Sequence, residues 1–219
     1  GQNMRKVNFS DEVPRGGLLT MGSVLKVTTD GFDTSPILRG AWISKNIVGT
    51  PLSPPPESVP ALEPEHGKAK TLKEQIDQHK SNKTCYACHK SIDPYGFALE
   101  SFDASGEWRE RYKIKQAHRS TFQYSPKGYF KIGAPVDASG EMGADKFENI
   151  FGLKRVLVSN EWKIAYNFAK KFFEYARGEK PNLEQRLYLW DFLGKAEENV
   201  RLKNIVTEVL IKTLNESKE

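Results

Sequence analysis

The chain has 219 residues, 38% hydrophobic and 28% charged, which predicts a globular protein with one large domain or two small ones. No run of about 18 apolar residues occurs, so we expect no transmembrane segment. The formal net charge of +5 is dispersed among acidic residues, which argues against a nucleic-acid partner and favours an ordinary solvated surface.

The first 65 residues predict one helix followed by an irregular segment. Residues 15–30 fit either a helical turn or a short strand. Residues 36–48 place Trp42 and several aliphatic side chains at helical spacing after Pro36, so we predict a helix that packs Trp42 into the core. Residues 50–65 hold six prolines and predict an extended connector, because proline lacks a backbone donor and restricts its predecessor.

A second helix is predicted over residues 71–80, directly before the cysteines. Thr71 suits the N-cap and Glu74 completes a capping box. Leu72, Ile76 and His79 then share one face of this helix, because residues three and four apart lie above one another.

The only two cysteines lie in Cys85-Tyr86-Ala87-Cys88-His89, the C-x-x-C-H pattern of covalent haem attachment. Two thioether bonds fix the porphyrin against one turn of backbone, and the imidazole that follows suits an axial iron position. The pattern therefore predicts one haem c bound through Cys85 and Cys88, with His89 as an axial ligand. Attachment of this kind occurs outside the cytoplasm, so we expect a periplasmic or otherwise exported protein.

Three other interpretations of the cysteines are weaker. A structural zinc site commonly has two ligand pairs, and the chain has no second cysteine pair. A thioredoxin-like pair belongs in a βαβ unit, which the flanking sequence does not suggest. A structural disulfide closing so short a loop would remove little chain entropy.

The segment after the motif, residues 91–112, is rich in aromatic and turn residues and predicts the wrap around the haem. We expect Phe97, Leu99 and Phe102 to pack on the macrocycle, where apolar cover tunes the iron. Trp108 and Arg109 are candidate partners of the haem propionates, because an indole N–H and a guanidinium both donate to carboxylates.

The rest of the chain predicts a small hairpin within residues 118–140 and then four helices, over 145–158, 160–177, 183–195 and 199–214. Gly178 is expected to end the second of these helices. Two apolar stripes predict the core of this helical bundle: Ala165, Phe168, Ala169, Phe172, Phe173 and Ala176 on one helix, and Ile205, Val206, Val209, Leu210 and Leu214 on another.

The predicted fold is therefore mainly α: a single-haem cytochrome module with a proline-rich connector and a small β-hairpin, followed by a C-terminal helical bundle. The predicted divisions are a haem-binding domain over residues 1–112, a hairpin connector over 113–144, and a helical domain over 145–219 packed on the haem domain.

Several strings resemble a known family: RGGLLTMGSVLKVTTDG, TSPILRGAWI, PPPESVPALEPE, LKEQIDQHKSNKTCYACHKSIDPYGFALESFDASGEWR and PVDASGE. They are similar to the C-terminal cytochrome-like domains, of unknown function, in planctomycete-type exported multidomain c-type cytochromes. The resemblance runs from about residue 15 to the end and is weakest after Asp145. It implies upstream cytochrome-like domains and a signal sequence before this chain, and a link to the breakdown of complex organic matter such as polysaccharides.

The second axial position decides the class of function. His79 on the preceding helix is the first candidate ligand, and Met142 and Met21 are the alternatives, whereas His66 and His118 suit solvated loops. A six-coordinate iron is typical of electron transfer to an upstream domain or a redox partner protein. An open position would instead permit a haem enzyme of peroxidase or oxygenase type. We expect electron transfer, because no distal acid–base pair stands near the motif.

Overall fold

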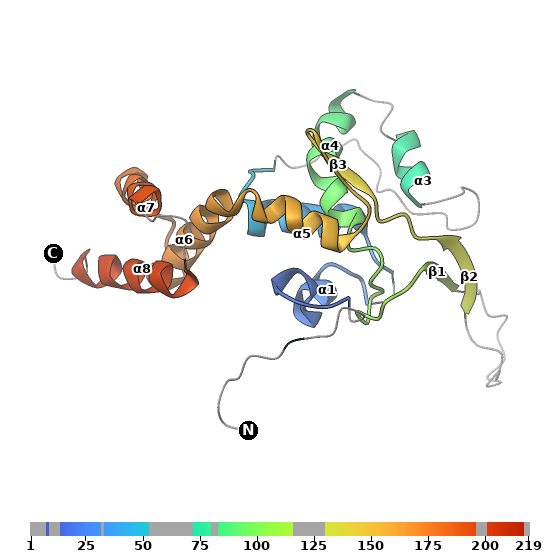
Figure 1. Ribbon diagram of the computed structural model, residues 1–219, viewed down its shortest axis with the longest axis horizontal. Helices are drawn as coiled ribbons and strands as arrows, with labels where there is room; N and C mark the ends of the chain where they lie inside the picture. Colours follow the sequence, from blue (N-terminus) through green and yellow to red (C-terminus); the bar gives the residue numbers. More distant parts are fainter. Residues whose placement is uncertain are drawn as a thin grey trace, which may run out of the picture. The chain divides into compact units, whose positions relative to one another are not determined.

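The computed structural model describes residues 8, 14–31, 33–52, 72–79, 83–115, 130–195 and 201–216 (Figure 1). Over these residues the protein is mainly helical with two small antiparallel sheets, which confirms the mainly α class. The chain divides into two compact units, Gly1–Ile43 with Ser53–Leu153 and Ser44–Leu52 with Lys154–Glu219. Within the described ranges, no helix has the length and apolar character needed to cross a membrane.

The first unit begins with two short helical elements. A 3-10 turn, η1, covers Leu18–Thr20, and α1 covers Gly22–Val27, which decides the choice over residues 15–30 in favour of helix. Gly17 has φ 69°, a conformation that glycine adopts without a steric penalty, and this lets the chain turn into η1. Thr29 then forms an isolated antiparallel bridge to Thr34.

The helix predicted over residues 36–48 is confirmed as α2, Pro36–Ile43, continued by the π-helical turn η2, Ser44–Val48. The prediction that Trp42 packs into the core is confirmed only in part, since this indole is half-buried. α2 packs on the later helix α4 through Gly40, where a Cβ atom would lie 2.0 Å from the backbone oxygen of Ile92. Trp42 is two residues further on, which is about 200° around the helix from this contact.

Helix α3, Leu72–His79, confirms the helix predicted over residues 71–80. Its Leu72 and Ile76 side chains are buried in one apolar cluster with Phe97 and Tyr112. The predicted N-cap Thr71 and the side chain of His79 lie outside what the structure describes, as does the proline-rich segment from residue 53 to 70.

Helix α4, Lys83–Phe97, carries the cysteine motif and continues into the segment predicted to wrap the haem. Gly96 allows α4 to approach α2, because a Cβ there would lie 1.7 Å from the backbone oxygen of Pro36. After Phe97 the chain forms a series of turns, with Phe102 and Trp108 joined by an isolated bridge.

Asp103 organises the last of these turns. Its Oδ1 atom accepts hydrogen bonds from the backbone N–H groups of Ser105 and Glu107, both at 2.9 Å, and its Oδ2 atom accepts one from Lys113 Nζ at 3.3 Å. Burial by itself raises the pKa of this carboxyl, but the hydrogen bonds and the Lys113 charge outweigh burial, so the pKa falls below its ordinary value of 3.8.

The lowered pKa of Asp103 predicts a specific acid sensitivity. The ionised carboxylate stabilises the fold above pH 3.8, and this contribution is lost as the pH falls through the lower pKa of the folded state. We expect Asp103→Asn to flatten the decline in unfolding free energy between about pH 5 and pH 2, measured by urea denaturation at each pH. A variant whose decline matches that of the wild type would contradict this assignment.

Two hairpins follow. Strand β1, Arg111–Lys115, pairs antiparallel with β2, Phe130–Pro135, so the predicted hairpin has its first strand before residue 118. Strand β3, Gly140–Met142, pairs with β4, Asp145–Phe147, around Gly143 at φ 64°. The helix predicted over 145–158 therefore begins only at Ile150, because a two-residue turn folds residues 140–147 into a hairpin.

Helix α5, Ile150–Val158, follows the second hairpin, and α6, Glu161–Arg177, ends at Gly178 with φ 75°, as predicted. Helices α7, Leu183–Lys195, and α8, Leu202–Glu216, complete the chain and match the predicted positions within three residues. In the second unit, α6 packs against α7 and α8, and the amide of Asn167 on α6 donates to the backbone oxygens of Asn46 and Ile47.

The core of the second unit confirms the predicted stripes in part. The buried residues are Ala169, Phe173, Leu189, Leu193, Ile205 and Val209. Ala176, Leu210 and Leu214 are exposed, and Thr213 is buried in place of the two leucines. The buried residues of α8 are therefore four positions apart, at 205, 209 and 213. The sequence does not decide between this face and the neighbouring one, because apolar residues also occupy positions 206, 210 and 214. The packing of these helices on the haem domain stays a prediction.

Candidate functional site

The cysteine motif is helical in the structure. Cys85, Cys88 and His89 occupy positions i, i+3 and i+4 of α4 and so belong to one face of the helix. Cys88 is exposed, which leaves its thiol accessible to a ligand approaching this face. Of Cys85 only the backbone position is described.

The next turn of α4 supplies a partner for His89. The Nδ1 atom of His89 lies 2.9 Å and 3.1 Å from the two carboxylate oxygens of Asp93, which is itself only 2% exposed. An ionised carboxylate only accepts hydrogen bonds, so Nδ1 is the ring nitrogen that carries the proton in this pair. In a neutral imidazole with the proton on Nδ1, the lone pair resides on Nε2, the nitrogen suited to a metal.

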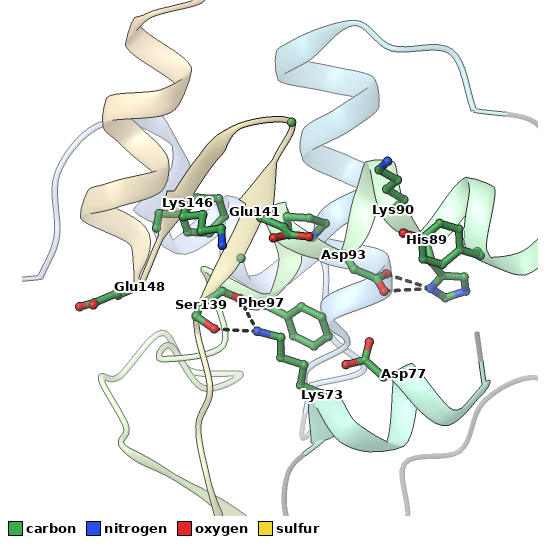
Figure 2. Close-up of a pocket in the computed structure, with 15 residues that line it drawn as sticks. Lys73, Asp77, His89, Lys90, Asp93, Phe97, Ser139, Glu141, Lys146 and Glu148 are labelled. Carbon is green, nitrogen blue, oxygen red and sulfur yellow. Dashed lines mark hydrogen bonds and ion pairs between the residues drawn. The ribbon is translucent and has the colours of Figure 1, made fainter. Parts of the chain in front are cut away.

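His89 and Asp93 line a cavity of about 890 Å³ in the first unit (Figure 2). Three elements form its walls: α4 contributes Phe97, α3 contributes Lys73 and Asp77, and the β3–β4 hairpin contributes several residues. The contributions of that hairpin and its flanking residues include Ser139, Gly140, Glu141, Lys146, Phe147 and Glu148. The volume lies within the range of about 300–1,000 Å³ that is typical of cofactor pockets.

Lys73 joins two walls of this cavity. Its ammonium group donates to the backbone oxygen of Ser139 at 2.9 Å and to its hydroxyl at 2.6 Å, and it lies 3.3 Å from the Asp137 carboxylate. Burial raises the pKa of Asp137, but hydrogen bonds from Ser139 and the Lys73 charge outweigh it and lower the pKa. These contacts hold α3 to the segment that leads into β3.

Of the apolar residues predicted to pack on the haem, Phe97 alone lines this cavity. Leu99 and Phe102 are fully buried elsewhere in the first unit, and Phe102 packs edge to face on Trp108 with ring centroids 5.3 Å apart. Trp108 is 42% exposed. Contact of Leu99, Phe102 and Trp108 with a haem stays a prediction.

Arg109 belongs to a buried charged cluster that sequence reasoning missed. Its Nη2 atom lies 3.0 Å from Oε2 of Glu100, and its Nε atom donates to the Glu100 backbone oxygen. Arg39 on α2 lies 2.8 Å from the other carboxylate oxygen of Glu100, and both side chains are fully buried. The predicted role of Arg109 as a propionate partner is untested, and here its guanidinium binds Glu100.

Burial is the main influence on the titration of this cluster. It lowers the pKa of Arg39, although Glu100 raises it in part, and it raises the pKa of Tyr112. The sequence holds one sign of this cluster: Arg39 interrupts the apolar string PILRGAWI, and Glu100 interrupts the apolar string FALESF. A charge that interrupts an apolar stripe indicates a buried partner, because an unpaired charge is rarely buried.

The three predicted candidates for the second axial ligand lie in different elements. His79 is the last residue of α3, and its side chain is outside the described part. Met142 is half-buried on β3, between two cavity-lining residues, Glu141 and Gly143, and is not itself in the lining. Met21 precedes α1 and is 51% exposed. His66 and His118 lie outside the described residues.

The donors of this site fit a haem c. The motif provides two thiols three positions apart, an imidazole beside the second thiol, and a buried carboxylate that fixes the imidazole ring. Among the described side chains, no group of three or more His, Cys, Asp or Glu residues could hold a metal ion directly. A haem iron makes a smaller demand on the protein, since the porphyrin supplies four nitrogens and the protein at most two axial ligands.

One family model matches the part of the chain that carries the motif. Residues 15–112 match the family model PSCyt3, described as a protein of unknown function, DUF1588. This is a domain of unknown function found in planctomycete-type cytochrome c proteins. No curated protein and no solved structure matches the chain. The match includes the motif and the Arg39–Glu100–Arg109 cluster, and the resemblance expected beyond residue 112 stays a prediction.

Proposed function

We propose that this chain is a c-type cytochrome domain that binds one haem through thioether bonds from Cys85 and Cys88, with His89 as an axial ligand. The observation that carries the proposal is the C-x-x-C-H motif on one face of α4, with His89 fixed by Asp93 at the edge of a large cavity. Two cysteines without a binding role would not require an adjacent histidine whose ring is held in one orientation.

In this proposal the face of α4 that carries the motif, together with the cavity beside His89, would hold the haem. Phe97 supplies an aromatic surface there, and Lys90 and Lys146, both exposed cavity residues, supply positive charge for the propionates. A bound haem supplies one-electron redox chemistry, and this chain's residues hold it and limit its contact with water.

We propose electron transfer as the role of this haem, within a larger exported protein. Its partner is an upstream domain of the parent protein or a separate redox protein. His79, Met142 and Met21 are the candidates for the second axial ligand, and a filled position suits electron transfer because no exchangeable site is then left on the iron.

The proposal is tested by expressing the chain with an export signal in a bacterium that attaches haem to such motifs. We expect a mass increase of one haem and a Soret band that stays with the polypeptide after denaturation. The variant Cys85→Ser/Cys88→Ser, expressed in parallel, should carry no covalent haem. Unmodified mass and two reactive thiols in the wild-type chain would refute the proposal.

The same sample separates electron transfer from the alternative of a haem enzyme. A low-spin spectrum that cyanide and carbon monoxide leave unchanged supports electron transfer. A high-spin spectrum that changes with these ligands would instead support an open iron site of the peroxidase or oxygenase kind.

A further inference from the structure

The pair formed by His89 and Asp93 differs from an ordinary hydrogen bond in its geometry and burial. Both carboxylate oxygens of Asp93 lie within 3.1 Å of one ring nitrogen of His89, and Asp93 is 2% exposed. The two residues are four positions apart on α4, so the helix itself sets their separation. Figure 2 shows the carboxylate directed at the imidazole along the helix face.

This arrangement restricts the imidazole in two ways. The bidentate contact fixes the ring orientation about its bonds to the backbone. It also keeps the proton on Nδ1, so that Nε2 carries the lone pair that would bind the iron of the haem proposed above. A partner of this kind, hydrogen-bonded to the second nitrogen of a metal-bound histidine, orients the ring and raises its basicity.

A carboxylate acts more strongly here than a neutral acceptor would. It carries a full negative charge, and hydrogen bonds to ionised groups are roughly twice as strong as neutral ones. Burial increases its effect further, because charges interact more strongly where water is excluded. A more basic imidazole beside a buried negative charge favours the iron state with the greater positive charge, which is the ferric state.

We propose that Asp93 is a positioning residue that orients His89 and lowers the reduction potential of the haem by stabilising ferric iron. This inference rests on the proposed function, since it concerns the iron ligand of that haem. It assigns to Asp93 the setting of the potential at which this domain exchanges electrons.

The test compares the haem-loaded wild type with Asp93→Asn in a spectroelectrochemical titration. Asparagine keeps the size of the side chain and removes its charge. We expect the ratio of ferric to ferrous iron at a fixed potential to fall at least tenfold, which raises the midpoint by about 59 mV for one electron. Asp77→Asn is the matched control, because Asp77 lines the same cavity from α3 and loses the same charge; its shift should be less than half as large.

Asp93→Glu provides a second measurement, which also serves if Asp93→Asn yields no haem protein. It keeps the charge but displaces the carboxylate by one methylene, so we expect a midpoint between those of the wild type and Asp93→Asn. A residue with only a structural role would change the unfolding midpoint and leave the potential unchanged. An unchanged potential in either Asp93 variant would overturn the inference while the haem assignment stands, whereas a wild-type chain without covalent haem would refute both.

Discussion

Glu100→Gln is expected to lower the free energy of unfolding of the first unit by about 3–5 kcal/mol. Glu100 is fully buried, and its carboxylate forms ion pairs with two guanidinium groups, Arg39 at 2.8 Å and Arg109 at 3.0 Å. Its Oε2 atom also accepts a hydrogen bond from Thr34 Oγ1 at 2.6 Å. Glutamine keeps the shape but leaves the buried Arg39 without a counter-charge, and an uncompensated buried charge is strongly destabilising.

Hydrogen exchange of the α2 and α4 amides in urea measures this loss in the unit that contains Glu100. Glu107→Gln is the matched control, because it makes the same change in an exposed ion pair. The Glu107 carboxylate lies 3.8 Å from Lys113 Nζ, and both side chains are exposed. We expect the control to change the unfolding free energy by less than about 1 kcal/mol. Equal losses in the two variants would show that the buried cluster contributes no more than a surface ion pair.

Gly96→Ala is expected to cost about 3 kcal/mol and to lower the yield of haem-loaded protein. A Cβ atom at Gly96 would lie 1.7 Å from the Pro36 backbone oxygen, and a Cβ atom at Gly40 would lie 2.0 Å from the Ile92 backbone oxygen of α4. Since no flexible side chain can move aside, one helix must shift. Because α4 also carries His89 and Asp93, its displacement would disturb the proposed haem site.

Gly22→Ala provides the control for this substitution. Gly22 opens α1 in the same unit, and a Cβ there meets no atom within 4 Å. We expect a change of less than about 1 kcal/mol, in the stabilising direction, since alanine is the better helix former. The measurements are urea unfolding and the ratio of Soret to protein absorbance. A Gly96→Ala variant as stable as Gly22→Ala would show that the two helices are not in backbone contact.

The local parts of the fold were accessible from sequence because their signals lie within a few residues. Helices α2, α3, α6 and α7 follow from the spacing of apolar side chains, and the end of α6 follows from Gly178, which adopts a positive φ. The second hairpin was missed because its strands are three residues each, too short to show an alternating pattern.

The motif of the candidate site was recognisable from the sequence, and the surroundings of the motif were not. The C-x-x-C-H spacing is complete within five residues, so the proposal of haem attachment needs no tertiary information. Asp93 also follows His89 by one helical turn and could have been found, had α4 been predicted to continue past the motif. The contribution of the β3–β4 hairpin to the cavity has no local signal, since it depends on how the chain returns to α4.

The amino-acid sequence by itself determined the C-x-x-C-H motif and most of the helices, because residue spacing within a motif and helical periodicity are properties of residues close together in the chain. Tertiary structure alone decided that Glu100 lies between Arg39 and Arg109, and that α2 and α4 touch through glycines. It also decided that Leu210 and Leu214 are exposed while Thr213 is buried. Arg39 and Glu100 are 61 residues apart, and whether such groups meet is set by the packing of whole helices rather than by any local preference.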